Sequence, residues 1–432
     1  MKVKLNNWGR YKSIDSNQYN IHDLQELKSY LLDKKKCIPS GNYRSYGDSA
    51  FSSDVINCKN YNSIISFDSS EGILKVQSGI TIDEVLTKIV PMGWFLAVTP
   101  GTKYATIGGA IASDVHGKNH HIDGCFSRCL INFDLMLSDG KVTTVEKNDS
   151  LFKATCGGMG LTGIIINASI KLKKIKSSYI NQLSIKTCNL KETFDVFEFY
   201  ANSSYSVAWF DGFSKSDKLG KCIIQIGDFS NDGILDYKKE LNSSIPFKYL
   251  SYLLSTYHIK LFNYLYYKLA SSNPKVSKVP LNKFFYPLDK FSNWNEMYGR
   301  GGFLQYQFIL PKEKSYEGIQ EIFRIIHNYK IYPYLSVLKL YGEENENYLS
   351  FPMEGYSLAM DFKANNKTLC MLNELDKIVC DYGGRIYLTK DARLSEKNFK
   401  SSYPKVDKFI EVRNEHDPYR KFNSLQSQRL DI

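Results

Sequence analysis

Residues 108–121 read GGAIASDVHGKNHH, a stretch whose pattern suits neither a helix nor a strand. Two glycines and a run of small residues lead through Asp114 to His116, so the backbone is bare beside polar side chains. Three of the chain's seven histidines fall within this stretch. Because glycine allows a ligand to approach the backbone closely, the stretch predicts a binding site for a metal, a phosphate or a cofactor.

The composition is that of a folded protein. The 432 residues are 43% hydrophobic and 23% charged, which excludes a disordered chain, and we expect two or three domains at this length. No stretch approaches the ~20 apolar residues of a membrane span, and the N-terminal MKVKLNNWGRYKSID lacks the apolar centre of a secretory signal. The nine cysteines are odd in number and scattered, which favours reduced thiols in the cytoplasm. The net charge of +11 indicates an anionic partner: nucleic acid, a phosphorylated ligand or an acidic membrane surface.

Hydrophobic periodicity predicts an α+β chain. Helices are expected over 22–36 and from Thr81 or Asp83 to the break at 91–93. A hairpin is expected over 129–147, with its turn at Asp139–Gly140. The glycine-rich character ends near residue 175, and strands and helices alternate from there to about residue 385, as in a second α+β domain. Residues 246–280 stand apart, because they are crowded with tyrosine, leucine and lysine and contain no acidic residue.

Four glycine-bearing loops lie within the first domain, at 40–48, 99–102, 108–121 and 157–163. The last contains a literal G-x-G-x-x-G, but a dinucleotide fingerprint follows a strand and opens a helix. Here the glycines follow the helix-like LFKAT and open a β-rich run, so the pattern argues against a Rossmann site. So many exposed N–H groups suit a long ligand with phosphates, which indicates a cofactor.

Other functions remain open from the residues alone. His116 and His120 have a formal zinc spacing, with Cys125 and Cys129 available, but Lys118 would place a cation among the ligands. The histidines could equally be hydrogen-bonded residues of a turn. The charge also fits a nucleic-acid-binding protein, although no known basic-aromatic module is present. Colour separates these hypotheses, because a flavoprotein is yellow and a zinc hydrolase is colourless.

Collinear motifs in both halves of the chain then carry a resemblance. They are NWGRYKS, RSYGDSAF, TPGTKYATIGGAIASDVHGKNHH, LFKATCGGMGLTGII, FFYPLD, GFLQYQFILP, LKLYG, LSFPMEGYSLAMDF, GGRIYLTKDARL and YPKVDKF. Together they resemble the decaprenylphosphoryl-β-D-ribose 2-oxidase family, which belongs to the vanillyl-alcohol oxidase superfamily of FAD flavoproteins. The similarity runs from Trp8 to the C-terminus and is weakest between about residues 180 and 280.

The resemblance implies a two-domain α+β flavoprotein. Residues 1–175 would form a PCMH-type FAD-binding domain of two α+β subdomains. Residues 176–385 would form a substrate-binding domain, an antiparallel sheet flanked by helices, with a basic aromatic insert at 246–280. Residues 386–432 would return to the FAD domain.

The resemblance also implies the site residues, with no metal among the ligands. The FAD-binding residues would be Ser40, Gly41, Asn42, Tyr43, Arg44, Ser45, Tyr46, Gly47, Asp48, Pro100, Gly101, Thr102, Thr106, Gly108, Gly109, Ala112, Ser113, His116, Gly117, Asn119, His120, Gly160, Gly163, Ile164 and Tyr387. Lys390 and His116 would be catalytic, and the substrate would contact Tyr46, Lys118, Gln307, Lys339 and Lys390. Oxidation of an alcohol on a flavin needs a base at the hydroxyl and positive charge near the reduced ring. From residue type alone, each lysine could equally be a solvated surface charge.

Three positions depart from the family or its relatives. Tyr43 stands where the family commonly has the second glycine of its first loop, so the pyrophosphate turn is expected to differ. Asp48 stands where covalent members of the superfamily carry the histidine that attaches the flavin, so we expect non-covalent FAD. Ala359 stands where mycobacterial enzymes carry a cysteine, so oxidation does not require a thiol at this position.

The activity implied by the resemblance is oxidation of the C2 hydroxyl of a polyprenyl-phosphoryl pentose to a 2-keto sugar. A separate NAD(P)H-dependent short-chain reductase would complete an epimerisation in cell-envelope polysaccharide synthesis, and no nucleic acid would be involved. The alternative is an FAD-dependent oxidase of soluble sugars or alditols. Because residues 246–280 suit an anionic bilayer surface, we expect a cytoplasmic protein held peripherally at the inner face of the plasma membrane.

Overall fold

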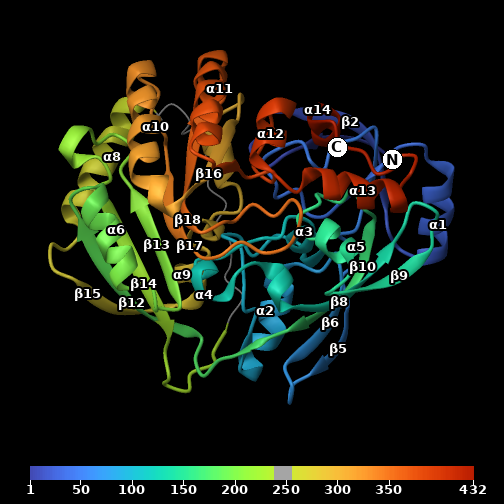
Figure 1. Ribbon diagram of the computed structural model, residues 1–432. Helices are drawn as coiled ribbons and strands as arrows, with labels where there is room; N and C mark the ends of the chain where they lie inside the picture. Colours follow the sequence, from blue (N-terminus) through green and yellow to red (C-terminus); the bar gives the residue numbers. More distant parts are fainter. Residues whose placement is uncertain (238–254) are drawn as a thin grey trace.

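Four β-sheets form in residues 1–237 and 255–432, which the computed structural model describes (Figure 1). Two larger sheets and a two-stranded ribbon lie in the first 174 residues. The fourth sheet has eight strands, all antiparallel, drawn from residues 179–386. This arrangement confirms the predicted α+β class with a large antiparallel sheet in the second half. The division of the chain at residues 175 and 385 stays a prediction.

The N-terminal half contains both parallel and antiparallel pairing. The four-stranded sheet has the order β1 (Lys2–Asn6), β2 (Ser13–Asn20), β4 (Asp54–Asn57) and β3 (Ile38–Ser40), with β2 and β3 parallel to β4. The five-stranded antiparallel sheet has the order β5 (Ile64–Asp68), β6 (Ile73–Gln77), β10 (Ile164–Lys171), β8 (Leu130–Met136) and β9 (Val142–Glu146). The ribbon pairs β11 (Lys173–Lys174) with β7 (Trp94–Phe95).

Helices form at both predicted places in this half, although the first is shorter than the predicted 22–36. Two short helices, Ile107–Ala112 and His120–Asp123, also overlap the 108–121 stretch, so the expectation that it suits neither helix nor strand was wrong there. Helix α1 spans Leu24–Asp33, and α2 spans Ile82–Ile89 with a capping box between Thr81 and Glu84. A short 3-10 turn, η1 (Val90–Met92), then ends in the left-handed Gly93. The hairpin of β8 and β9 is confirmed as well. The remaining elements are α3 (Ile107–Ala112), α4 (His120–Asp123), η2 (Phe126–Cys129) and α5 (Ser150–Thr155).

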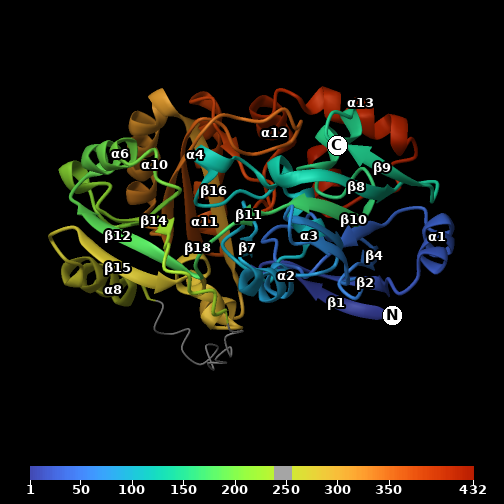
Figure 2. The same ribbon diagram turned by 90° about the horizontal axis from the view of Figure 1, so that it is seen from below.

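The eight-stranded sheet has helices on both faces. Its order is β15 (Lys275–Pro280), β12 (Tyr179–Thr187), β14 (Cys222–Phe229), β13 (Tyr205–Phe210), β17 (Ser336–Tyr341), β18 (Gly355–Lys363), β16 (Phe303–Pro311) and β19 (Arg385–Ile386). Helices α6 (Leu190–Phe199), α10 (Ser315–Tyr329) and α11 (Asn366–Asp381) lie on one side, and α8 (Thr256–Leu269) lies on the other (Figure 2). Strand alternation explains this, because Phe210 stacks on Phe323 of α10 whereas its neighbour Trp209 contacts Tyr266 of α8.

The last residues return to the N-terminal half (Figure 1). Cys37 pairs with the strand-like segment around Phe422, and Arg429 forms ion pairs with Asp48 (2.8 Å) and Asp391 (2.9 Å). The backbone N–H of Tyr46 donates to the carbonyl of Thr389. The helices of this C-terminal region are α12 (Glu396–Ser402), α13 (Val406–His416) and α14 (Leu425–Leu430). The described part of the second half also contains the short helices α9 (Leu281–Phe285), η3 (Ser216–Lys218), η5 (Pro287–Lys290), η6 (Trp294–Tyr298) and η7 (Lys312–Lys314).

One hydrophobic cluster joins the parts, because its buried members run from Leu5 to Ile432 and come from both large antiparallel sheets. Among the helices in the described ranges, none is both long and apolar enough to cross a bilayer. Of the predicted insert at 246–280, residues 246–254 lie outside the described residues, and the rest forms α8 and β15.

Candidate functional site

A cavity of about 1050 Å³ lies where the glycine loops meet one face of the eight-stranded sheet. The structure brings most of the predicted site residues to its wall. They are Ser40, Gly41, Asn42, Tyr43, Arg44, Ser45, Tyr46, Pro100, Gly101, Thr102, Thr106, Gly108, Gly109, Ala112, Ser113, His116, Gly117, Lys118, Gly160, Gly163, Gln307, Lys339, Tyr387 and Lys390. Residues from all four glycine loops and from three separate strands or loops of the second half therefore share one cavity.

Five predicted residues do not line this cavity and serve the surrounding structure instead. The carboxylate of Asp48 is paired with Lys12 and Arg429. The backbone of Gly47 packs so closely on Asp391 that an added Cβ would lie 1.7 Å from its carbonyl oxygen. The others are Asn119, which donates to the carbonyl of Ala97, His120, whose Nδ1 accepts from the N–H of Gly342, and Ile164, which is buried in the five-stranded sheet.

The 108–121 stretch owes its shape to two anchors. Thr106 caps α3, because its hydroxyl accepts from the N–H of Gly109 at 3.2 Å. Asp114 is fully buried at a positive φ of 38° and accepts hydrogen bonds from Asn345, Asn347 and Ser350 at 2.7–2.8 Å. This carboxylate therefore ties the stretch to the second half of the chain and fixes the position of the histidine two residues later.

His116 projects into the cavity among aromatic rings and polar groups. Its Nε2 lies 3.2 Å from the amide nitrogen of Gln307, which also lies 3.3 Å from the Ser357 hydroxyl. Because that amide nitrogen can only donate, neutral His116 accepts at Nε2 and carries its proton on Nδ1. Burial, with the positive charges of Lys339 and Lys390 nearby, holds the pKa of His116 well below its usual range. The ring is therefore neutral at physiological pH.

Three lysines converge on the same cavity. Burial lowers the pKa of Lys390 to about 7, with Asp361 opposing that shift. Burial likewise lowers the pKa of Lys118 to about 7 and that of Lys339 to about 8. Lys390 Nζ lies 3.8 Å from the centre of the Tyr46 ring, and Lys118 donates to the carbonyl of Phe284. At neutral pH these groups can take up or release protons, unlike a lysine in water.

Two buried carboxylates were not predicted from the sequence: Asp289 lines the cavity, and Asp361 lies behind its wall, near Lys390. Asp361 is 1% exposed and accepts from Tyr298 (2.9 Å) and Gln305 (2.7 Å), and burial raises its pKa to about 6. Asp289 accepts from the Thr102 hydroxyl (2.9 Å) and the Lys103 N–H (2.7 Å). Both lie in the quoted motifs SLAMDF and FFYPLD, so the signal was present, but sequence alone did not single out these positions.

The wall of the cavity fits a large ligand with polar atoms. Within the described part of the chain, Arg44 Nε and His116 Nδ1 are buried without a hydrogen-bond partner. A Cβ added at Gly101 would meet no protein atom within 4 Å, so this loop leaves space open at the wall. Tyr43, in place of the family glycine, adopts a left-handed φ of 49° and bonds to Ser40 and Gln18 through its hydroxyl. The first loop therefore keeps a glycine-like conformation with a larger side chain.

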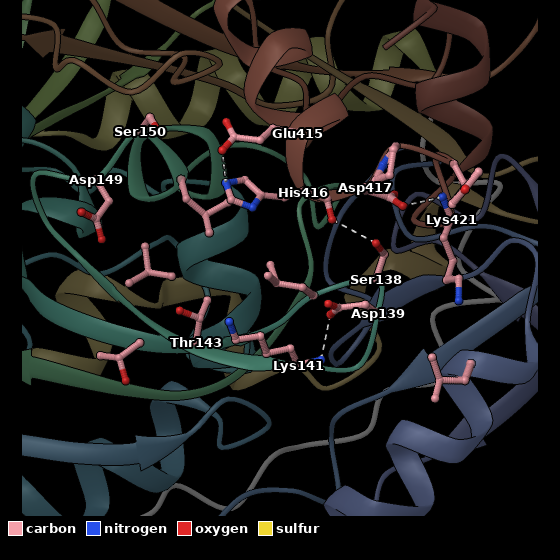
Figure 3. Close-up of a pocket in the computed structure, with 17 residues that line it drawn as sticks. Ser138, Asp139, Lys141, Thr143, Asp149, Ser150, Glu415, His416, Asp417 and Lys421 are labelled. Carbon is pink, nitrogen blue, oxygen red and sulfur yellow. Dashed lines mark hydrogen bonds and ion pairs between the residues drawn. The ribbon is translucent and has the colours of Figure 1, made fainter.

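A second cavity, of about 800 Å³, lies apart from these residues, between the β8–β9 hairpin and the end of α13 (Figure 3). Its polar groups stabilise local turns. Ser138 donates to the carbonyl of His416, Asp139 accepts from the N–H of Lys141, and Asp417 accepts from two backbone N–H groups that follow it. None of the predicted site residues lines it, so the larger cavity is the candidate active site.

The three histidines of the 108–121 stretch contact different residues. His116 faces Gln307, His120 meets Gly342, and His121 contacts the carbonyl of Ser203 at 2.9 Å. Among residues 1–237 and 255–432, no group of three or more His, Cys, Asp or Glu side chains is arranged to hold a metal ion.

Comparisons with known proteins agree with the geometry. Residues 20–146 match the family described as FAD binding domain, and residues 304–430 match the D-arabinono-1,4-lactone oxidase family. The decaprenylphosphoryl-β-D-ribose oxidase of Mycolicibacterium smegmatis is 35% identical over 412 residues, which cover 91% of this chain and 89% of that protein. The L-gulonolactone oxidase of Mus musculus is 22% identical over 452 residues, 97% of this chain and 96% of the relative. These matches confirm that the chain has an FAD-binding domain, and the assignment of individual loop residues to FAD stays a prediction. The chain belongs to the decaprenylphosphoryl-β-D-ribose oxidase family, as an FAD-dependent oxidoreductase that acts on alcohol groups.

Proposed function

We propose that this enzyme oxidises the C2 hydroxyl of a polyprenyl-phosphoryl pentose to a 2-keto sugar. The observation that carries the proposal is the convergence of Lys390, Lys339, Lys118 and neutral His116 on one cavity beside the glycine loops. Cationic groups suit a phosphate and a developing negative charge, and a neutral amine suits proton transfer. The relative in M. smegmatis, named for decaprenylphosphoryl-β-D-ribose, supports this substrate class.

The residues that line the cavity would have different roles in the reaction. Bound FAD, held by the loops at 40–46, 99–102 and 106–117, would supply the acceptor for the hydride that leaves C2. Lys390, with its pKa near 7, accepts the hydroxyl proton at Nζ and thereby becomes a cation beside the reacting centre. His116 donates from Nδ1 to hold the sugar or cofactor in place, because Gln307 occupies its Nε2. Lys339 binds a sugar hydroxyl or the phosphate.

FAD is proposed to bind without a covalent link. The carboxylate of Asp48 stands where covalent relatives carry histidine, and its ion pairs with Lys12 and Arg429 turn it away from the cavity. Acid precipitation is expected to leave the yellow colour in the supernatant. Colour that stays with the pellet would contradict the proposal.

The proposed substrate is tested by the bleaching of bound flavin. Purified enzyme is mixed without oxygen with prenyl-phosphoryl pentoses, free pentoses and alditols, and absorbance is followed. We expect bleaching by the prenyl-phosphoryl pentose and a 2-keto product that accumulates until an NAD(P)H-dependent short-chain reductase is added. Such a reductase is the proposed pathway partner, because a 2-keto sugar reduced from the opposite face gives the epimer.

A second candidate is oxidation of soluble sugars or alditols. It is favoured by the match of residues 304–430 to the D-arabinono-1,4-lactone oxidase family. Preferential bleaching by a free alditol or sugar would establish this function in place of the first.

We further propose peripheral contact with an anionic membrane through α8. This helix has no acidic residue, and large side chains on it are exposed: Tyr257 (85%), Leu261 (55%), Phe262 (60%), Tyr264 (58%) and Leu269 (82%). Apolar side chains gathered in this way, with Lys260 and Lys268 among them, suit the headgroup region of a bilayer. Contact at the inner face of the plasma membrane would bring the cavity to a lipid-linked substrate.

Sedimentation with vesicles of phosphatidylglycerol and phosphatidylcholine tests this contact. The double variant Leu261→Glu/Leu269→Glu is expected to stay in the supernatant. Phe199→Glu is the matched control, because Phe199 is 80% exposed but lies on α6, across the sheet from α8. Equal sedimentation of both variants and the unmodified enzyme would show that α8 is not the contact.

A further inference from the structure

The active-site cavity has an arm that the proposed chemistry does not use. From Gln307 the wall crosses paired neighbours on adjacent strands, Ala359, Val337 and Trp209, all of which line the cavity. It then continues along the same face through Gln225 and Ser184 to Lys275 on the edge strand β15. We call the part beyond Val337 the outer arm.

The path along the cavity wall from β16 to β15 is longer than a sugar phosphate. From β16 to β15 there are six strand-to-strand steps, and at about 4.8 Å per step they span about 29 Å. A pentosyl phosphate is about seven bonds long, and at roughly 1.2 Å per bond it covers about 8 Å. If the head group lies at Gln307 and Lys390, roughly 20 Å of the path remains, which is the extended length of about four isoprene units.

The outer arm has an aromatic roof supplied by α8. Tyr266 meets Trp209 edge to face at 5.0 Å and stacks on Phe262 at 5.8 Å, and all three rings line the cavity. On the floor, the amide of Gln182 donates to the hydroxyl of Ser184 at 2.9 Å, so these polar groups partly satisfy one another. The flat rings of the roof, more than the partly polar floor, give this arm a surface that suits a slender unsaturated hydrocarbon.

The arm also leads to the apolar surface of α8. Phe262 and Tyr266 line the cavity and are at the same time 60% and 40% exposed, so the inner wall and the outer face of this helix are continuous. A chain that leaves the arm here meets Leu265 and Leu269 on the same helix. The exit therefore lies where the proposed membrane contact would be.

We propose that the outer arm binds the first isoprene units of the substrate, along the wall that Trp209, Phe262 and Tyr266 form together. This inference rests on the proposed function, since it assigns a place to the lipid of that substrate. The rest of the polyprenyl chain leaves the protein at α8 and stays in the membrane, while the sugar reaches the cavity. Chain length is then a determinant of affinity, and the chemical step does not depend on it.

In the kinetic test, a bulky side chain blocks the outer arm, and KM and kcat are compared for two substrates with the same head group. One carries a single isoprene unit and the other carries five. Ser184→Trp places a bulky ring in the arm, and Asn181→Trp is the matched control, because Asn181 is exposed on the same strand and points to the other face. For Ser184→Trp we expect KM to rise at least tenfold for the long substrate only, with kcat unchanged for both and no change in the control.

Equal effects on the two substrates, or none on the long one, would overturn the inference while leaving the proposed function intact. Failure of both substrates to bleach the flavin of the unmodified enzyme would instead refute the proposed function. Binding then tests the arm by itself. Geranylgeranyl phosphate, below its micelle concentration, is expected to change tryptophan fluorescence in the unmodified holoenzyme and not in Trp209→Phe. An identical response in both proteins, or no response in either, would show that the chain does not bind beside Trp209.

Discussion

Lys390→Met is expected to slow flavin reduction strongly while FAD stays bound. With a pKa near 7, Lys390 is about one-tenth neutral at pH 6 and about nine-tenths neutral at pH 8. If its neutral amine takes the hydroxyl proton, the rate of bleaching rises about tenfold across this range and is flat above it. Loss of one preorganised group of this kind lowers a rate on the order of 10²–10³-fold. The variant should therefore be slower by that factor at pH 8 and should lose the pH dependence.

Rapid mixing of oxygen-free enzyme with substrate measures both quantities on variants matched for FAD content by absorbance. Lys174→Met is the control, because Lys174 is exposed on β11 and does not line the cavity. Bleaching of Lys390→Met at the rate of the unmodified enzyme would refute the catalytic assignment. A reduced rate with an unchanged pH profile would keep Lys390 as a cation but remove it as the proton acceptor.

Five other outcomes follow from the structure. His116→Ala should lower both the rate of flavin bleaching and the affinity for substrate, because the ring positions the sugar. Rapid mixing over a range of substrate concentrations measures the rate and the affinity separately. If both are unchanged, His116 does not act in the site. Lys339→Met should raise KM more than it lowers kcat, in steady-state assays. Apoenzyme of Lys339→Met should also have a higher melting temperature than the unmodified apoenzyme below pH 8, because a pKa near 8 in the folded protein means that burial disfavours the charged lysine. This difference in melting temperature should disappear as the pH rises from 8 toward 10.5, where the lysine also becomes neutral in the unfolded chain. A difference that stays constant across this range would contradict the assignment. Arg429→Met leaves the carboxylate of Asp48, which is 2% exposed, with Lys12 as its ion-pair partner. The free energy of unfolding, measured in denaturant, should therefore fall by about 3 kcal/mol. An unchanged denaturation midpoint would show that the Arg429–Asp48 pair contributes nothing to stability. Tyr43→Gly relieves about 1 kcal/mol of left-handed strain but loses a half-buried ring worth about 3–5 kcal/mol, so it should lower the melting temperature.

The parts of the fold that local chemistry determines were predictable. The capping box at Thr81, the turn at Asp139–Gly140 and the density of glycine loops each follow from short-range rules, and the structure confirms the helix and the hairpin. The convergence of Lys390 and His116 was predictable only through resemblance, because the residues are far apart in sequence and meet through tertiary packing.

What the sequence could not predict depends on register and on strand order. Asp361 is recognisable as a buried partner of Tyr298 and Gln305 only once β16 and β18 are paired. Trp209 joins the cavity because β13 lies next to β17, a neighbour more than a hundred residues later. The same dependence on tertiary structure affects Asn119 and His120, which were predicted to bind FAD: they do not line the cavity, and they bond to Ala97 and Gly342.

The pairing of the first glycine loop with the end of the chain also bears on synthesis. Tyr46 bonds to Thr389, and Asp48 pairs with Arg429, so the loop near residue 45 acquires these two partners only after residues 389–429 have left the ribosome, whereas its contacts with Trp8 and Lys12 can form early. Contacts of such long sequence separation form late and slowly. Through most of translation the nascent chain therefore lacks the C-terminal contacts of this loop, and we expect FAD to bind after translation. Cells short of the cofactor would then accumulate a finished but loosely closed polypeptide, open to proteolysis at its first loop.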